Sequence, residues 1–329
     1  MIKCNEYKIL ISTAILLGSL SISSAASSQT ANAYPSKPVT VIVGFTAGGP
    51  TDFVARILAE QLSKKFNQNF IIDNKAGANG GVAAGLVKNS APDGYTLMFG
   101  SSGTLAIAPH LQKNLPYDPV RDFTPIGLVA SYPYFLVTPT LSSLVTLDDL
   151  INRGSNPSTE LSFASAGNGS VNHLAGEWFK YETKIRATHI PYKGDSAAIP
   201  DIVSGRVDFS FLAGAAALPQ VKAGKLRILA SASSVPGRGG ENILTLGENR
   251  IKGFAAEPWN GLMGPAGLNR ETVIKLNTAI NEIMNRKEIV DRLAAIEQYP
   301  FTGTPEQFTK HINEQTIRWG VVIKNANIK

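Results

Sequence analysis

The chain has 329 residues, a formal net charge of +6 and one cysteine, Cys4. Its charges are scattered, without a run of Lys and Arg and without interleaved aromatic residues, which argues against nucleic-acid binding. Because Cys4 precedes every predicted strand and helix, the folded part should contain no disulfide and no thiolate metal ligand. Its stability must come from hydrophobic cores, and a chain of this length suggests two domains.

The first residues have the pattern of a secretory signal peptide. Lys3 and Lys8 are followed by an apolar stretch, Ile9–Leu20, and then by a run of Ser and Ala. A basic start, a short apolar core and a small-residue exit predict removal after export, and the core is shorter than the ~20 residues that span a bilayer. We therefore expect a signal peptide at 1–33, with cleavage after Ala26 or Ala33, and an exported protein of formal charge about +5.

Strand and helix patterns alternate after the signal. The β-branched run Val39–Phe45 predicts a buried strand. Val54, Ile57, Leu58, Leu62 and Phe66 recur at helical spacing, and Thr51 or Asp52 can cap that helix. The next predicted elements are a strand at Phe70–Ile72, a helix opened by Gly77–Gly85 and a strand at Tyr95–Phe99. This order is typical of a parallel sheet with crossover helices.

A second α/β unit follows in the middle of the chain. Its predicted strands are Leu161–Ala164, Thr188–Pro191, Val207–Leu212 and Leu226–Ala230, and its predicted helices are Ser170–Tyr181, Ala197–Ser204 and Ala215–Ala223. The end of the chain is helical, at Asn269–Arg286 and from Thr304 onward, where Pro305 suits a first turn.

If the final helices pack on the first sheet, the second unit is inserted into the first. We therefore expect domain 1 at 34–132 plus 258–329 and domain 2 at 133–257. The crossings Ala130–Val137 and Phe254–Met263 would form a hinge. Trp259 and Tyr134, near these crossings, are expected to pack in the core or hinge.

Two glycine-rich loops between a strand and a helix are the candidate binding loops. They are Gly44–Thr51 and Ser165–Ser170. Glycine lets a backbone approach a ligand closely, and a helix N-terminus offers free N–H groups and the positive end of a dipole. Ligands of open α/β sheets bind at the carboxyl ends of strands, where both loops would lie. One anion-binding loop in each domain predicts a small carboxylate gripped from both sides.

Other polar residues have two readings each. Ser101 and Thr104 could reach a ligand or cap a turn. His173 could bind a ligand, but we expect it to hold the second loop. Asp195 could face the ligand, where it would disfavour a second carboxylate and favour an ammonium or hydroxyl group, or it could cap the helix that follows.

Catalytic signatures are missing from the sequence. It contains no P-loop, no complete dinucleotide fingerprint and no Gly-x-Ser-x-Gly elbow. Gly194-Asp195-Ser196 is similar to the nucleophile block of one lipase class, but no Asp-x-x-His follows. His110, His173, His189 and His311 lack ligand-like spacing. We expect no enzyme, no metal and no cofactor, with an exported hydrolase as an alternative.

The chain also resembles a known family through a series of short motifs. They are Tyr34-Pro35-Ser36-Lys37-Pro38, Gly44-Phe45-Thr46-Ala47-Gly48-Gly49-Pro50-Thr51-Asp52, Ala91-Pro92-Asp93-Gly94-Tyr95-Thr96-Leu97, Ser102-Gly103-Thr104, Pro116-Tyr117-Asp118-Pro119, Pro191-Tyr192-Lys193-Gly194 and Trp259-Asn260-Gly261-Leu262. Such a series, in this order, resembles the Bug family, the periplasmic receptors of tripartite tricarboxylate transporters.

The resemblance implies a periplasmic-binding-protein (Venus-flytrap) α/β fold with mostly parallel sheets. It implies a periplasmic receptor, here expected to be a monomer, that takes a dicarboxylate, an amino acid or an aromatic acid to membrane transporter subunits. A receptor that feeds a sensor kinase is the alternative. The ligand contacts that the resemblance implies are backbone N–H groups and loop residues, at Phe45, Thr46, Ala47 and Gly48 on one side and at Ser165, Gly167, Asn168, Gly169 and Ser170 on the other. Asp195 stands where this family usually has a small or neutral residue.

Overall fold

The computed structural model describes residues 34–238, 240 and 242–328. The predicted signal peptide and its two cleavage positions therefore lie outside the described residues. Two β-sheets organise the chain from Lys37 onward. We call the first sheet with the helices against it the first lobe, and the second sheet with its helices the second lobe.

The first sheet has the strand order β11-β4-β10-β3-β1-β2. Its strands are β1 (Val39–Val43), β2 (Phe70–Asn74), β3 (Thr96–Ser101), β4 (Phe123–Ser131), β10 (Trp259–Pro265) and β11 (Tyr299–Pro300). The helices of this part of the chain are α2 (Pro50–Phe66), η1 (Ala78–Gly80), α3 (Gly81–Lys88), η2 (Gly103–Ile107), α4 (Ala108–Leu111), α10 (Arg270–Met284), α11 (Lys287–Ala294) and α12 (Pro305–Asn325).

The second sheet has the strand order β7-β6-β8-β5-β9. Its strands are β5 (Tyr134–Pro139), β6 (Leu161–Ser165), β7 (Ala187–Pro191), β8 (Phe209–Ala213) and β9 (Leu226–Ser231). The helices between and after them are α5 (Leu147–Ser155), α6 (Val171–Thr183), α7 (Asp195–Val203), α8 (Gly214–Lys222) and α9 (Leu246–Asn249).

The α/β fold class is confirmed, but the expectation of mostly parallel sheets is wrong. β1 is parallel to β2 and β3, and β6 is parallel to β7 and β8. β10 and β5, however, run antiparallel to both of their neighbours. Each of these two strands enters its sheet from the other lobe. It therefore starts at the edge where the parallel strands end and must run the opposite way.

The chain passes between the lobes twice. It leaves the first sheet after β4 and enters the second at β5, and it returns after β9 to enter the first at β10. The backbone N–H of Tyr132 donates to the carbonyl of Pro258 at 3.1 Å. This hydrogen bond ties the two crossing segments to each other.

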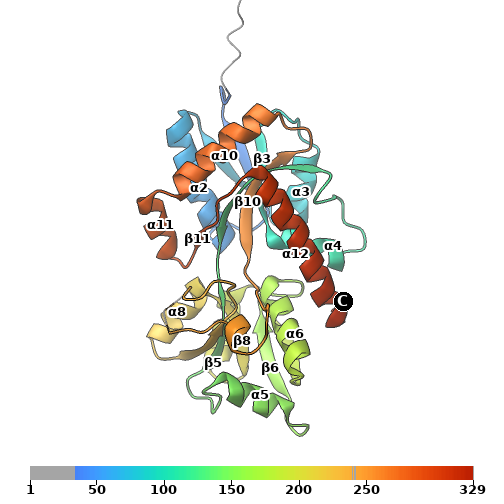
Figure 1. Cartoon of the computed structure of the whole chain (residues 1–329), viewed down its shortest axis with the longest axis vertical. Coiled ribbons are helices and arrows are strands. Elements are labelled where there is room, and N and C mark those ends of the chain that lie inside the picture. Colours follow the sequence, from blue (N-terminus) through green and yellow to red (C-terminus); the bar gives the residue numbers. More distant parts are fainter. Residues whose placement is uncertain (1–33, 239, 241, 329) are drawn as a thin grey trace, which may run out of the picture. The chain divides into compact units, whose positions relative to one another are not determined.

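The helices bury their apolar faces on these sheets. α10 packs on β4 and on α2, and α6 packs on β8. The long helix α12 lies against β4 and α4 of the first lobe and also against α6 of the second (Figure 1). There Trp178 stacks on Phe254 with ring centroids 4.3 Å apart and meets Trp319 edge to face at 6.2 Å. Aromatic packing therefore joins α12 to the second lobe.

Trp259 and Tyr134 are buried near the crossings, at 1% and 6% exposure. The expectation of core or hinge packing for both residues is confirmed. Within the residues that the structure describes, no helix combines the length and the apolarity needed to cross a membrane.

Candidate functional site

The first candidate loop links β1 to α2 and is open to solvent. Thr46, Ala47 and Gly48 are exposed, and Phe45 is partly buried. Gly48 has a backbone φ of +81°, in the left-handed region that favours glycine. Within the described part of the chain, no acceptor is recorded for the backbone N–H of Thr46 or Ala47. The loop therefore presents unpaired N–H groups to its surroundings, as the sequence predicts.

Asp52 holds this loop from the first turn of α2. Its carboxylate accepts the N–H of Gly48 at 2.9 Å, the Nε–H of Arg56 at 2.8 Å and an amide N–H of Asn74 at 2.8 Å. Burial alone would raise the pKa of Asp52, but the hydrogen bonds from Arg56, Gly48 and Asn74 outweigh it and lower the pKa. The N–H of Gly48 thus already has an acceptor, which corrects the expectation that it faces a ligand.

The expected side-chain cap of α2 is also wrong. The helix begins at Pro50 with Gly49 as its N-cap residue, and no side chain caps it. Thr51 lies in the first turn and is 8% exposed. Pro50 has no N–H and the Phe53 N–H donates to the Gly49 carbonyl, so the N–H groups of the buried residues Thr51 and Asp52 are the ones that need another acceptor. The positive end of the helix dipole lies at the same place.

The second candidate loop, between β6 and α6, satisfies most of its own N–H groups. Ala166 donates to Asn172 Oδ1 at 3.2 Å, and Gly169 donates to His173 Nδ1 at 3.1 Å. Gly167 donates to Ser165 Oγ at 3.1 Å. Ser170 is the N-cap of α6, where its hydroxyl accepts the N–H of His173 at 3.3 Å.

This internal bonding corrects the idea that all of these residues offer free N–H groups. Among the described residues, Asn168 is the loop member that is exposed and whose N–H has no recorded acceptor. His173 takes the expected role of holding the loop. Its neighbour His189, which lies on β7, shares a hydrogen bond of 2.6 Å with the hydroxyl of Ser165.

Asp195 is the first residue of α7 and connects three elements of the second lobe. The N-cap of α7 is Gly194, without a side-chain cap bond, so the cap expectation for Asp195 is wrong. The Asp195 carboxylate instead accepts Asn172 Nδ2 at 2.8 Å and the N–H of Ala213 at 3.1 Å. Burial raises the pKa of Asp195 to about 6, against the opposing effect of these two bonds.

Two tyrosines at the first crossing lie within electrostatic reach of Asp195. Burial and the Asp195 charge both raise the pKa values of Tyr132 and Tyr134. Asp195 keeps part of its surface exposed although its surroundings are dense. The coupling to both tyrosines places the carboxylate beside the crossing.

The hydroxyl of Ser101 is turned toward its own loop. It lies 3.1 Å from Thr104 Oγ1 and accepts the N–H of Thr104 at 3.3 Å. Thr104 in turn donates to the carbonyl of Asn79 at 2.9 Å. Of the two readings for Ser101 and Thr104, the turn-capping one matches these bonds.

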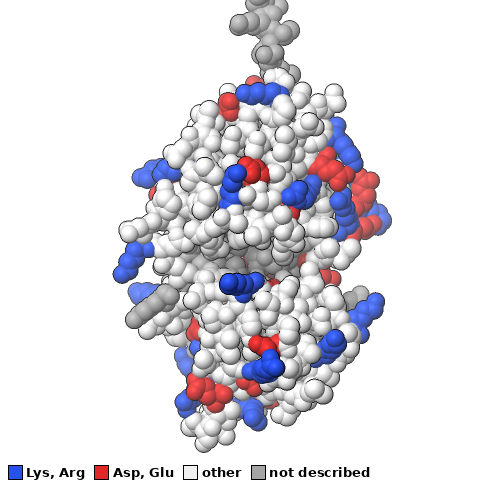
Figure 2. Space-filling model, turned by 180° about the vertical axis from the view of Figure 1, so that it is seen from behind, with Lys and Arg blue, Asp and Glu red and all other residues white. Residues whose placement is uncertain are grey.

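The candidate loops follow the carboxyl ends of β1, β3 and β6. A Cβ built on Gly169 would come within 2.9 Å of Leu111 Cδ1 in α4, so the second loop lies against the first lobe. A Cβ on Gly214 would likewise come within 2.5 Å of Glu297 Cβ. Figure 2 shows that one face of the molecule is hollowed between the two lobes, with basic and acidic side chains at the rim of the hollow.

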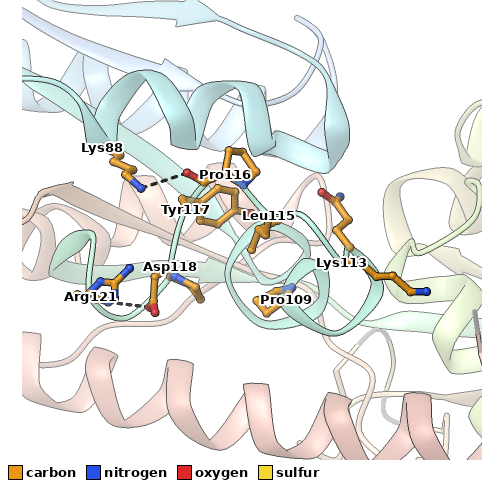
Figure 3. A pocket seen from close by; sticks show the side chains of 10 residues that line it. Lys88, Pro109, Lys113, Leu115, Pro116, Tyr117, Asp118 and Arg121 are labelled. Atoms are coloured by element: carbon orange, nitrogen blue, oxygen red, sulfur yellow. Dashed lines mark hydrogen bonds between the residues drawn. The ribbon is translucent and has the colours of Figure 1, made fainter.

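Two further hollows contain none of the predicted ligand contacts. One, with a volume of about 400 Å³, lies on the first lobe beside Lys88, Lys113, Tyr117 and Arg121 (Figure 3). In it the Lys88 ammonium donates to the Pro116 carbonyl at 3.1 Å and pairs with Asp122 at 2.8 Å, so that charge is already balanced.

The other hollow, of about 150 Å³, lies near the crossings and is lined by Ser131, Arg238, Glu257, Trp259 and His311 among others. Arg238 Nη1 lies 2.8 Å from Glu257 Oε1 and 3.0 Å from Ser131 Oγ. No cluster of three or more His, Cys, Asp or Glu side chains that could hold a metal is found within residues 34–238, 240 and 242–328.

Asn260 is a residue near the first loop that sequence reasoning did not single out. It is 1% exposed, and its amide nitrogen makes only long contacts, 3.5 Å to Thr51 Oγ1 and 3.4 Å to the Gly100 carbonyl. Its Oδ1 is buried without a partner among the described residues. A buried acceptor of this kind requires a donor such as an ordered water. Its position within the motif Trp259-Asn260-Gly261-Leu262 was the sequence feature that could have identified it as a site residue.

Comparison with known proteins gives a consistent result. Residues 54–328 match the model of the tripartite tricarboxylate transporter family receptor. BugT of Bordetella pertussis is 33% identical over 326 residues, which is 99% of either chain. A protein from the tcbD-tcbE intergenic region of a Pseudomonas species is 31% identical over 91% of this chain and 89% of its own.

Solved structures agree. An R. palustris protein with adipate has a TM-score of 0.81 at 32% identity and covers 90% of this chain and 99% of its own. MatC from Rhodopseudomonas palustris with bound malate has a TM-score of 0.76 at 30% identity over 88% and 100%. The periplasmic binding protein BugD has a TM-score of 0.77 at 28% identity over 90% and 99%. The chain therefore belongs to the tripartite tricarboxylate transporter receptor family, in which it is a Bug-type receptor.

Proposed function

We propose that this protein captures a small carboxylate between its two lobes and delivers it to membrane transporter subunits. The observation that carries the proposal is the start of α2. This helix has 17 residues, no side-chain cap and a first turn in which Thr51 and Asp52 are buried, beside the exposed segment Thr46–Gly48. A carboxylate would accept the orphan N–H groups and would be stabilised by the helix dipole.

In this proposal the first loop binds through Phe45, Thr46, Ala47 and the start of α2. Gly48 shapes the loop, because its own N–H is held by Asp52. In the second loop Asn168 makes the outward contact. Ser165, Gly167, Gly169 and Ser170 keep the loop in shape, because their polar groups bond to one another and to α6. Ser101 supports the turn that follows β3.

Asp195 sets the chemistry at the far end of the ligand. Among the residues that the structure describes, no cation contributes to the electrostatics of its carboxylate, which is held by one amide and one backbone N–H. A ligand with a hydroxyl or ammonium group there would donate to Asp195, whereas a second carboxylate would be repelled while Asp195 is ionised. Malate, which MatC holds, is a dicarboxylate with a hydroxyl group, and adipate is a plain dicarboxylate.

Capture would involve movement of the lobes about the crossings. We propose a first domain of 34–132 plus 258–329 and a second domain of 133–257. The boundaries lie at the segment where the Tyr132 N–H donates to the Pro258 carbonyl. The family description supports a membrane transporter as the partner and the periplasm as the location.

Titration calorimetry on the mature protein tests the capture step. The panel should include acetate, succinate, malate, adipate, aspartate and benzoate. We expect one group of acids to bind with Kd near or below micromolar, about −8 kcal/mol or more favourable. Absence of heat with every acid, in a preparation that still unfolds cooperatively, would refute the proposal.

A further inference from the structure

The second loop is held in place by two histidines. His173, on α6, accepts the N–H of Gly169 through Nδ1 at 3.1 Å. His189, on β7, shares a 2.6 Å hydrogen bond with Ser165 Oγ, which in turn accepts the N–H of Gly167 at 3.1 Å. Both glycines have positive φ values, +128° for Gly167 and +74° for Gly169. The two histidines thus reach the two most unusual backbone positions of the loop.

The His173 bond requires a neutral ring, whereas His189 Nε2 can either accept from or donate to the Ser165 hydroxyl. A backbone N–H can only donate, so Nδ1 of His173 must be free of a proton and the ring proton must reside on Nε2. If Nδ1 gained a proton, two donors would face each other and the bond to Gly169 would be lost. Protonation therefore acts on the shape of the loop through one defined contact.

The rings are also packed so that they disfavour charge. Their centroids are 3.9 Å apart with an interplanar angle of 25°, and Phe163 stacks on His189 at 4.9 Å. His173 is only 8% exposed. Two imidazolium rings at this separation would repel each other, so protons enter the pair one at a time.

The surrounding charges act in the same direction. Lys180, on α6, lies over the Phe163 ring at 5.5 Å and is paired with Glu177 at 2.9 Å. Burial, with added repulsion from His189 and Lys180, lowers the pKa of His173 to about 4. Burial and Lys180 lower the pKa of His189 to about 4 as well.

We propose that His173 and His189, as a stacked pair, position the loop 165–170 for the ligand, and that protonation of His173 releases the loop and with it the ligand. The two histidines are positioning residues, because they act through Gly169 and Ser165. Release of the ligand rests on the proposed function, whereas the control of the loop by the pair does not.

The test uses the mature protein without ligand. Imidazole ¹⁵N chemical shifts are followed from pH 7.5 to 3.5, together with hydrogen exchange of the backbone amides of 165–170. We expect His173 to carry its proton on Nε2 and to titrate near pH 4. Over the same step, protection of the Gly169 amide should fall at least about tenfold after correction for intrinsic exchange, while amides of β1 stay protected.

His173→Asn is the matched variant. Its Oδ1 can accept the Gly169 N–H but does not titrate, so we expect the protection of Gly169 to persist through the acid step. His110→Asn is the control, because His110 Nε2 lies 2.8 Å from the Thr316 carbonyl of α12 and makes no recorded hydrogen bond to the described loop residues. It should leave the acid step of Gly169 unchanged.

A proton on Nδ1 of His173 at pH 7, titration near the ordinary value of 6.5, or an equal loss of Gly169 protection in His173→Asn would overturn the proposal. The tautomer and the titration pH of His173 in the wild-type spectrum test the proposal even if the variant fails to fold. Failure of the carboxylate panel would leave these spectra unaffected, so the two proposals can fail separately.

Discussion

The carboxylate of Asp52 accepts the backbone N–H of Gly48 at 2.9 Å, across the start of α2. The same carboxylate accepts hydrogen bonds from Arg56 Nε and Asn74 Nδ2, each at 2.8 Å. A single side chain at 1% exposure therefore joins the candidate binding loop to α2 and β2. Because the Gly48 N–H is used inside the protein, a ligand must be held by the other N–H groups of the loop and helix start.

Replacement of Asp52 by Asn should destabilise the protein. The amide keeps one acceptor but loses the charge that strengthens the bonds to Arg56 and Gly48. We expect a loss of about 1.5–3 kcal/mol in the free energy of unfolding. Asp73→Asn is the control, since its pair with Lys75 is 40–44% exposed and should be worth at most about 1 kcal/mol. Urea unfolding measures both, and equal losses would show that the Asp52 bonds are weak.

The pH dependence of that variant has a defined sign. The folded pKa of Asp52 lies below its ordinary value of 3.8. The stability that Asp52 contributes is therefore fully present above that value and is lost as pH falls through the folded pKa. The difference between wild type and Asp52→Asn should be constant from pH 8 to 5 and shrink below pH 4.

Gly48→Val and Gly205→Val form a matched pair that separates backbone strain from ligand contact. Both glycines have positive φ, +81° and +75°, and neither would place a Cβ within 4 Å of another group. Each variant should lose at least about 1–2 kcal/mol of stability, because a β-branched residue is strained there. Only Gly48→Val should also lose affinity for carboxylates, by at least about tenfold, since its side chain would enter the space of the anion. Equal affinities in calorimetry would place the ligand elsewhere.

Asp195→Asn should change ligand preference in a pH-dependent way. The pKa of Asp195 is raised to about 6, so the carboxylate is ionised at pH 7.5 and mostly neutral at pH 5. At pH 7.5 the variant should bind dicarboxylates about tenfold tighter than wild type. At pH 5 the two proteins should bind dicarboxylates with similar affinity. Asp148→Asn, whose side chain is 65% exposed, is the control. If the ratio of variant to wild-type affinity were the same at both pH values, Asp195 would only stabilise the start of α7.

The raised pKa of Asp195 also predicts a stability trend. A carboxyl whose folded pKa exceeds its ordinary value of 3.8 stabilises the fold fully below that value, and the contribution is lost as pH rises through about 6. Relative to wild type, Asp195→Asn should therefore be least stable in acid. Unfolding curves at pH 4.5 and 7.5 measure the change.

Arg238→Met should weaken the junction of the crossing segments. Arg238 bonds to Glu257 and Ser131, and the side chains of the ion pair are only 19% and 13% exposed. Removing one partner leaves Glu257 partly buried and unpaired, at a cost of about 1–3 kcal/mol. Arg206→Met, which breaks an ion pair whose Arg side chain is 75% exposed, should cost less than about 1 kcal/mol. Similar midpoints in thermal unfolding would contradict the role of Arg238.

Local signals accounted for many helices and strands, but no pattern predicted β4, β5, β10, β11, α5 or α11. Thr304 and Pro305 predicted the start of the last helix, which begins at Pro305 with a capping box between Thr304 and Gln307. The run from Val39 predicted β1, which ends at Val43, two residues before the predicted end. Such patterns work because a cap or a β-branched run involves residues only a few positions apart.

Contacts between distant residues were beyond such patterns. Asn74 reaches Asp52 from 22 residues away, and His189 reaches Ser165 from 24 residues away. The direction of β10 and β5 likewise depends on which lobe the chain has just left. None of this has a local sequence signature, because it depends on how the strands are ordered in the sheets.

The sequence by itself determined the α/β rhythm, the two glycine-rich loops and the family, because glycine, caps and apolar periodicity act over short distances. Only the tertiary structure decided which N–H groups of those loops remain unpaired. The N–H of Gly48 donates to Asp52, that of Gly169 donates to His173, and that of Gly167 donates to the Ser165 hydroxyl. A donor is free only when folding brings no acceptor to it, and that depends on the whole packed arrangement around the loop.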